Sequence, residues 1–91
     1  MVDMTLKSDQ QRYFRTTSLV LATFLCAKGR QVAGVHPTDS SSKKEFAFIS
    51  DALLEKLVDA YKFGERDSED LLVAVHLYEH ARNEMLDRLN E

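Results

Sequence analysis

Residues 16–29 read TTSLVLATFLCAKG and predict the short helix that decides the fold. Thr16, Thr17 and Ser18 offer hydroxyl groups where a helix favours its N-cap, and Gly29 stands where a left-handed C-terminal cap favours glycine. Almost every position between them is apolar, so no face of the helix is left for water. Because a helix that is apolar all round is buried on several sides, we expect the rest of the chain to pack around it.

The length and composition predict one intracellular globular domain. The sequence has 91 residues, enough for a single domain with a thin core. Cys26 is the only cysteine and lies in the apolar helix, which predicts a buried, reduced thiol and no internal disulfide. The longest apolar run, residues 19–27, is far shorter than the roughly 20 residues of a membrane span, and no signal pattern precedes it. We therefore expect a cytoplasmic protein without a membrane partner.

The first half of the chain predicts three strands. Residues 1–10 are polar and unpatterned and read as a flexible N-terminal tail, which leaves residues 11–91 as a single α+β domain. Residues 11–16 mix aromatic, threonine and basic side chains, as an edge strand does. Residues 31–36 and 45–49 predict an antiparallel hairpin around a polar loop, with a bulge at Gly34.

The second half predicts two helices. Ser50 is the expected N-cap of the first of them, and Gly64 its expected C-terminal glycine cap. Ser68 is expected to open a last helix of about twenty residues, or about 30 Å. The predicted fold is therefore α+β, a small three-stranded antiparallel sheet with helices packed on one face, in the order β-α-β-β-α-α. The apolar helix of residues 16–29 should lie between the sheet and the later helices.

The last predicted helix is longer than the rest of such a domain can cover. We expect its final turns to extend beyond the domain and to meet a partner helix, most often one from a second copy of the chain. The side chains predicted to form this self-association surface are Tyr78, Met85, Leu86 and Leu89.

Charge is distributed unevenly along the chain, although the formal net charge is only −3. Residues 1–44 contain seven Lys or Arg and three Asp or Glu, whereas residues 45–91 contain five and twelve. Either the acidic helices are simply solvated, or the basic half faces an acidic protein or a nucleic acid. The candidate nucleic-acid-binding residues are Arg12, Tyr13, Arg15, Lys28, Arg30, Lys43 and Lys44. The alternative for the aromatic pair is that Tyr13 or Phe14 belongs to the core.

The string HLYEH at residues 76–80 matches the H-x-x-E-H pattern of one class of zinc peptidase. His76 and His80 are four residues apart and lie on one helical face, so they are weak candidates for metal ligands. Only eleven residues follow His80, and they supply no clear third ligand for a catalytic site. The alternative is a solvated helix face, and we assign neither a catalytic residue nor a cofactor.

The sequence also resembles a known family. The residues that carry the resemblance are residues 14–25, Gly29, residues 46–48, Tyr61 and Gly64. They resemble a family of short uncharacterised proteins of bacteria and mobile elements, a domain of unknown function with a leucine-rich first helix that ends in glycine and a later F-x-F strand. The resemblance covers residues 13–86 and implies a fold but no activity. This chain departs from the family at Ser18, where aspartate is usual, and in a longer loop at residues 37–44.

These observations predict a small non-enzymatic interaction module. It would act through protein–protein contacts and form a homo-oligomer through its C-terminal helix. The alternative is a nucleic-acid-binding accessory protein that uses a basic N-terminal face.

Overall fold

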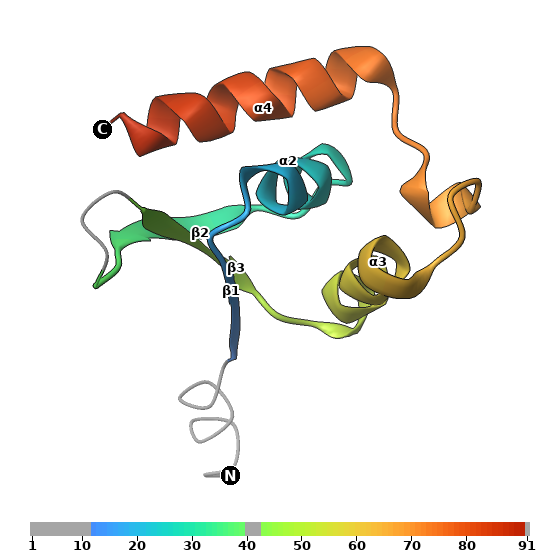
Figure 1. Cartoon of the computed structure of the whole chain (residues 1–91), viewed down its shortest axis with the longest axis horizontal. Coiled ribbons are helices and arrows are strands. Elements are labelled where there is room, and N and C mark those ends of the chain that lie inside the picture. Colours follow the sequence, from blue (N-terminus) through green and yellow to red (C-terminus); the bar gives the residue numbers. More distant parts are fainter. Residues whose placement is uncertain (1–11, 40–42, 91) are drawn as a thin grey trace, which may run out of the picture.

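Three antiparallel strands and three α-helices make up the described part of the computed structural model, residues 12–39 and 43–90 (Figure 1). In chain order the elements are β1 (Tyr13–Thr16), α2 (Leu19–Ala27), β2 (Val32–Pro37), β3 (Lys44–Ile49), α3 (Ala52–Phe63), the 3-10 turn η1 (Glu69–Leu71) and α4 (Val75–Leu89). The predicted α+β class and the order β-α-β-β-α-α are confirmed. The predicted tail at residues 1–10 lies outside the described residues.

The start and stop signals of α2 act as the sequence predicts. The Ser18 hydroxyl oxygen accepts the Leu21 N–H at 3.1 Å, and the Thr16 hydroxyl oxygen accepts the Ser18 N–H at 3.0 Å. After the helix, Gly29 adopts φ +94°, a conformation that favours glycine. Every residue from Leu21 to Leu25 is buried, so α2 is the centre of the core.

The strand order is β1-β3-β2, which places β1 at one edge of the sheet. Phe48 of β3 pairs with Phe14 of β1 and with Val32 of β2, and all three side chains belong to the core or pack against it. The register of β2 against β3 shifts between Val32 and Gly34. The predicted hairpin, edge strand and bulge are therefore confirmed.

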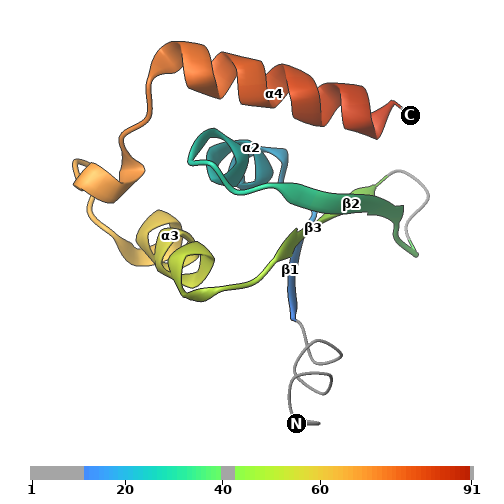
Figure 2. The same ribbon diagram turned by 180° about the vertical axis from the view of Figure 1, so that it is seen from behind.

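The sheet, α2 and α4 form successive layers, with α2 in the middle (Figures 1 and 2). α3 follows β3 and packs beside α2, where Leu54, Leu57 and Val58 complete the core. No helix of the described residues is long and apolar enough to cross a membrane.

The prediction of one continuous last helix is wrong. Ser68 does accept a backbone N–H, that of Asp70 at 3.3 Å, but it opens only the single turn η1. Leu72 and Ala74 are extended, with ψ 135° and 138°, and α4 begins at Val75. The break lets the chain leave α3 and turn back across α2, so the packing of α4 overrides local helix propensity.

Two predicted caps also need correction. Asp51 caps α3, because its carboxylate accepts the Leu54 N–H at 2.8 Å, and Ser50 does not. Gly64 ends the helix with φ −74° and ψ 166°, which is ordinary extended backbone and not the predicted left-handed cap.

Candidate interaction surfaces

None of the described helices covers one face of the sheet, which we call the open face. The helices cover the face that carries Phe46 and Phe48, whereas alternation along the strands places Tyr13 and Ile49 on the other face. These two residues pair directly across β1 and β3, and each side chain is almost half exposed. Phe14, with the opposite orientation, packs against the core. Of the aromatic pair, the structure therefore assigns Phe14 to the core and leaves Tyr13 on the surface.

The open face has a shallow hollow, lined by Tyr13, Arg15, Ala33, His36 and Ala47. Ala47 also lines the hollow and is only 3% exposed. Arg15 lies 3.6 Å from the Glu45 carboxylate, the only acidic side chain within the three strands. Both partners keep solvent access, so this ion pair contributes at most about 1 kcal/mol.

The two hairpin lysines have different surroundings. The Lys44 ammonium donates to the Leu89 backbone carbonyl at 2.7 Å and therefore lies on the helix side, at the C-terminal end of α4. This position suits a cation, since the helix dipole is negative there. Lys43 is exposed and lies immediately before β3, at the hairpin end of the sheet.

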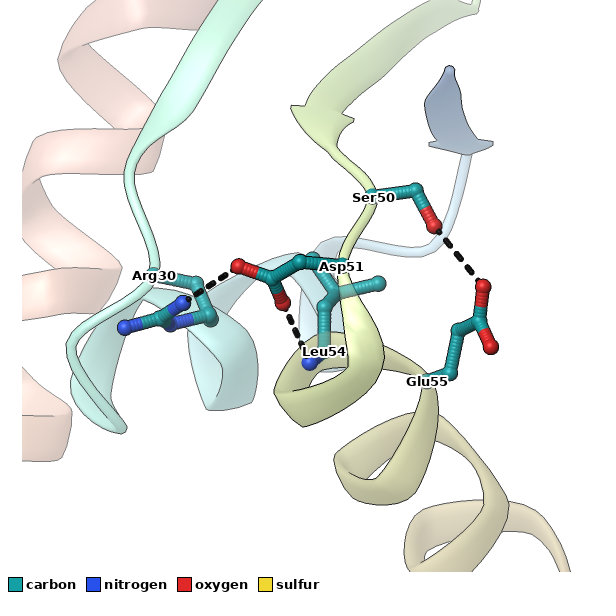
Figure 3. A network of polar contacts seen from close by, with 5 residues as sticks. All are labelled: Arg30, Ser50, Asp51, Leu54 and Glu55. Atoms are coloured by element: carbon teal, nitrogen blue, oxygen red, sulfur yellow. Dashed lines mark hydrogen bonds and ion pairs between the residues drawn. The ribbon is translucent and has the colours of Figure 1, made fainter. Parts of the chain in front are cut away.

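The basic residues after α2 make contacts within the fold. The Lys28 ammonium lies 5.9 Å from the centroid of the Phe24 ring, and Arg30 forms an ion pair of 3.0 Å with Asp51 (Figure 3). Shallow clefts flank Arg30 on two sides, one reaching Asp51 and the other reaching Arg88 on α4. In both clefts the Arg30 side chain contributes to the wall.

The structure thus brings together only part of the predicted basic set. Tyr13 and Arg15 share the open face, Lys43 adjoins it just before β3, and the hollow adds His36, which was not among the predicted binding residues. Arg12 is exposed at the end of β1, where its carbonyl accepts the Ser50 N–H. Lys28, Arg30 and Lys44 lie elsewhere. Strand alternation separates Arg15 from Lys44, whereas Lys28 and Arg30 lie in the connection between α2 and β2.

The predicted self-association residues are mostly covered within the chain. Met85 is 0% exposed and belongs to the core, and Tyr78, Leu86 and Leu89 are partly buried. The prediction that the last turns of the helix extend beyond the domain is wrong, because Met85 is buried in the core, Leu89 packs against it, and the Leu89 carbonyl accepts the Lys44 ammonium.

The most exposed apolar side chains lie instead between the end of α3 and the first turn of α4. The four most exposed large apolar residues of the described chain all lie within residues 63–77. We call the surface that these four residues form the connecting end. The four residues are Phe63 (79% exposed), Leu72 (62%), Val75 (70%) and Leu77 (56%). The connection between α3 and α4 forms the end of the molecule opposite the β2–β3 hairpin (Figures 1 and 2). The sequence pattern missed this surface, because it predicted one continuous helix from Ser68 onward, whereas the chain is extended at Leu72 and Ala74.

The two metal candidates are on the surface of α4. His76 is almost fully exposed, with its Nδ1 3.9 Å from a Glu79 carboxylate oxygen, and His80 is also exposed. Across residues 12–39 and 43–90, no three His, Cys, Asp or Glu side chains are grouped so as to hold a metal ion. Weak zinc binding by the histidine pair stays a prediction.

Cys26 lies partly buried near α4. Burial raises the pKa of its thiol, and the negative charge of Glu84 adds to this effect while Arg88 opposes it. The thiol is therefore held in its protonated, weakly nucleophilic form.

Comparison with protein-family models, curated proteins and solved structures finds no match. The resemblance to the family of short bacterial and mobile-element proteins stays a prediction from the sequence.

Proposed function

We propose that the chain is a non-enzymatic interaction module that acts through protein–protein contacts and self-associates through the connecting end. The observation that supports this proposal is the concentration of exposed apolar surface at Phe63, Leu72, Val75 and Leu77. Isolated exposed apolar residues are common, but several in one short segment are typical of a contact surface. Full burial of one such side chain contributes about 1.5–3 kcal/mol to association. In a two-fold symmetric dimer each such contact occurs twice.

The charge of the same segment gives the proposed contact a distinctive salt dependence. Between Phe63 and Leu72 the chain carries four acidic residues and one basic residue. Two copies that meet there bring like charges together, and salt screens charges beyond about 8 Å at physiological ionic strength. Self-association should therefore strengthen as salt is added.

The test is sedimentation velocity over a concentration series at low and high salt. Val75→Glu with Leu77→Glu should give a folded monomer, because both side chains are exposed and an acidic residue in the first turn of α4 suits the helix dipole. Val20→Glu is the matched control, since Val20 is a similarly exposed residue in the first turn of α2. The proposal fails if the wild type stays monomeric at high micromolar concentration, or if the control dissociates the oligomer equally well.

A further inference from the structure

The open sheet face presents the aromatic ring of Tyr13, which does not belong to the hydrophobic core. Phe14, the neighbour of Tyr13, packs against the core, while the Tyr13 ring lies at the surface beside Ile49. Among the described residues the only close ring pair is Phe24 with Tyr61, so no other ring stacks on Tyr13. Beside it the hollow exposes Arg15 and His36, with the small Ala47 between the strands. A flat apolar ring next to a guanidinium group is suited to a planar, negatively charged ligand.

Charge makes this face different from the rest of the molecule. Among the described residues, the open face carries Arg15, His36 and Glu45, and the exposed Lys43 adjoins it just before β3. Residues 51–90 carry ten acidic and five basic residues, and they supply α3, η1 and α4. An extended polyanion would therefore be attracted to the sheet and repelled from the helices. The net charge of −3 does not prevent this, because physiological salt screens charges beyond about 8 Å.

We propose that the open sheet face binds single-stranded nucleic acid, with Tyr13 stacked on a base and Arg15 and Lys43 in contact with phosphates. A single strand fits this face better than a duplex, because stacking on a side chain needs a base that is free of its own stack. The site is small, since the six residues of β3 span only about 20 Å. It holds a few nucleotides, without strong sequence preference. The proposal concerns a different surface from the connecting end and does not depend on self-association.

Glu45 has a defined part in this site. Its carboxylate lies 3.6 Å from the Arg15 guanidinium, and more than half of the Arg15 side chain is exposed. Exchange of the solvated Glu45 carboxylate for a phosphate costs little, so Arg15 is available to bind a nucleic-acid strand. The Glu45 charge itself repels phosphate. Glu45→Gln should therefore tighten binding, an effect that loss of a purely structural contact would not produce.

The experiment measures fluorescence anisotropy of labelled oligothymidylate, and of a duplex of equal length, at several salt concentrations. Tyr13→Ala should weaken single-strand binding about five- to a hundredfold, the loss expected for one stacked base, whereas Tyr13→Phe should retain it. Arg15→Gln should flatten the log–log salt dependence by about 0.7 for one lost phosphate contact. Each variant is first shown to be folded by circular dichroism.

Matched controls lie outside the open face. Phe63→Ala removes an exposed ring from the connecting end, and Lys56→Gln removes an exposed cation from α3. Both should leave oligothymidylate affinity unchanged. The proposal is overturned if neither nucleic acid binds at low salt, if the duplex binds as tightly as the single strand, or if Tyr13→Ala has no effect. It is also overturned if polyglutamate binds the same face as tightly, because the surface then selects acidic chains without stacking.

Discussion

An ion pair between Arg30 and Asp51 joins the α2–β2 connection to the β3–α3 connection. Arg30 Nη1 lies 3.0 Å from Asp51 Oδ2, while Oδ1 of the same carboxylate accepts the Leu54 N–H at 2.8 Å (Figure 3). One carboxylate therefore caps α3 and holds the start of that helix against the α2–β2 connection. Leu54, which receives the cap, is fully buried, so this polar contact fixes the place where α3 enters the core.

Asp51→Ala should lower the free energy of unfolding more than Ser50→Ala does. Loss of an N-cap costs about 0.5–2 kcal/mol, and loss of a partly exposed ion pair adds at most about 1 kcal/mol. Asp51→Asn keeps a capping oxygen and should recover most of the loss. The Ser50 hydroxyl donates to the exposed Glu55 side chain, and the Ser50 N–H bond to Arg12 survives substitution, so Ser50→Ala should change stability by less than about 0.5 kcal/mol. Urea unfolding measures all three, and a Ser50→Ala loss equal to that of Asp51→Ala would restore Ser50 as the cap.

Leu25→Ala should be strongly destabilising, because Leu25 is fully buried in the middle layer between the sheet and α4. Removal of such a side chain costs on the order of 2–5 kcal/mol, a large share of the total stability of a small domain. Val20→Ala is the control on the same helix, since Val20 is about half exposed. An unchanged denaturation midpoint for Leu25→Ala would contradict the central position of α2.

The fold was predictable where one local pattern determined it. The hydroxyl groups before α2, the glycine after it and the apolar residues between leave few alternatives to a buried helix. In β3, Phe46 and Phe48 define one face by simple alternation. These features depend on neighbours in sequence, and the structure follows them.

The errors occur where distant packing decides between similar local options. Ser50 and Asp51 are both good N-caps, and only the position of Arg30 favours the second. Nothing local breaks the chain at Leu72, but α4 must cross α2, so the helix begins later and Met85 becomes a core residue. The strands likewise separate the candidate binding residues. Tyr13 and Arg15 lie on the same face of β1, whereas Lys44 contacts the C-terminal end of α4.

Cys26 should react slowly with iodoacetamide at neutral pH. Burial raises its thiol pKa above the ordinary value, and the Glu84 charge contributes, so little thiolate is present. Glu84→Gln should lower the pKa and speed the reaction, whereas Glu79→Gln, a change at an exposed position elsewhere on α4, should not. The unfolded thiol ionises at a lower pH than the folded one, so stability should fall as the pH rises past the pKa of the unfolded thiol. Equal reaction rates for folded protein and free cysteine would contradict this prediction.

Gly29 and Gly64 should both resist replacement by alanine, but for different physical reasons. At Gly29 a Cβ atom would meet nothing within 4 Å, and the cost comes from φ +94°, about 1–2 kcal/mol for an L-residue in left-handed backbone. At Gly64 the backbone is ordinary, but a Cβ atom would lie 2.6 Å from the Ala60 carbonyl oxygen. Asparagine tolerates left-handed backbone and still has a Cβ atom. Gly29→Asn should therefore recover stability relative to Gly29→Ala, whereas Gly64→Asn should be no better than Gly64→Ala. Thermal unfolding of the four variants measures the difference, and recovery by asparagine at both sites would show that the clash at Gly64 does not govern its role.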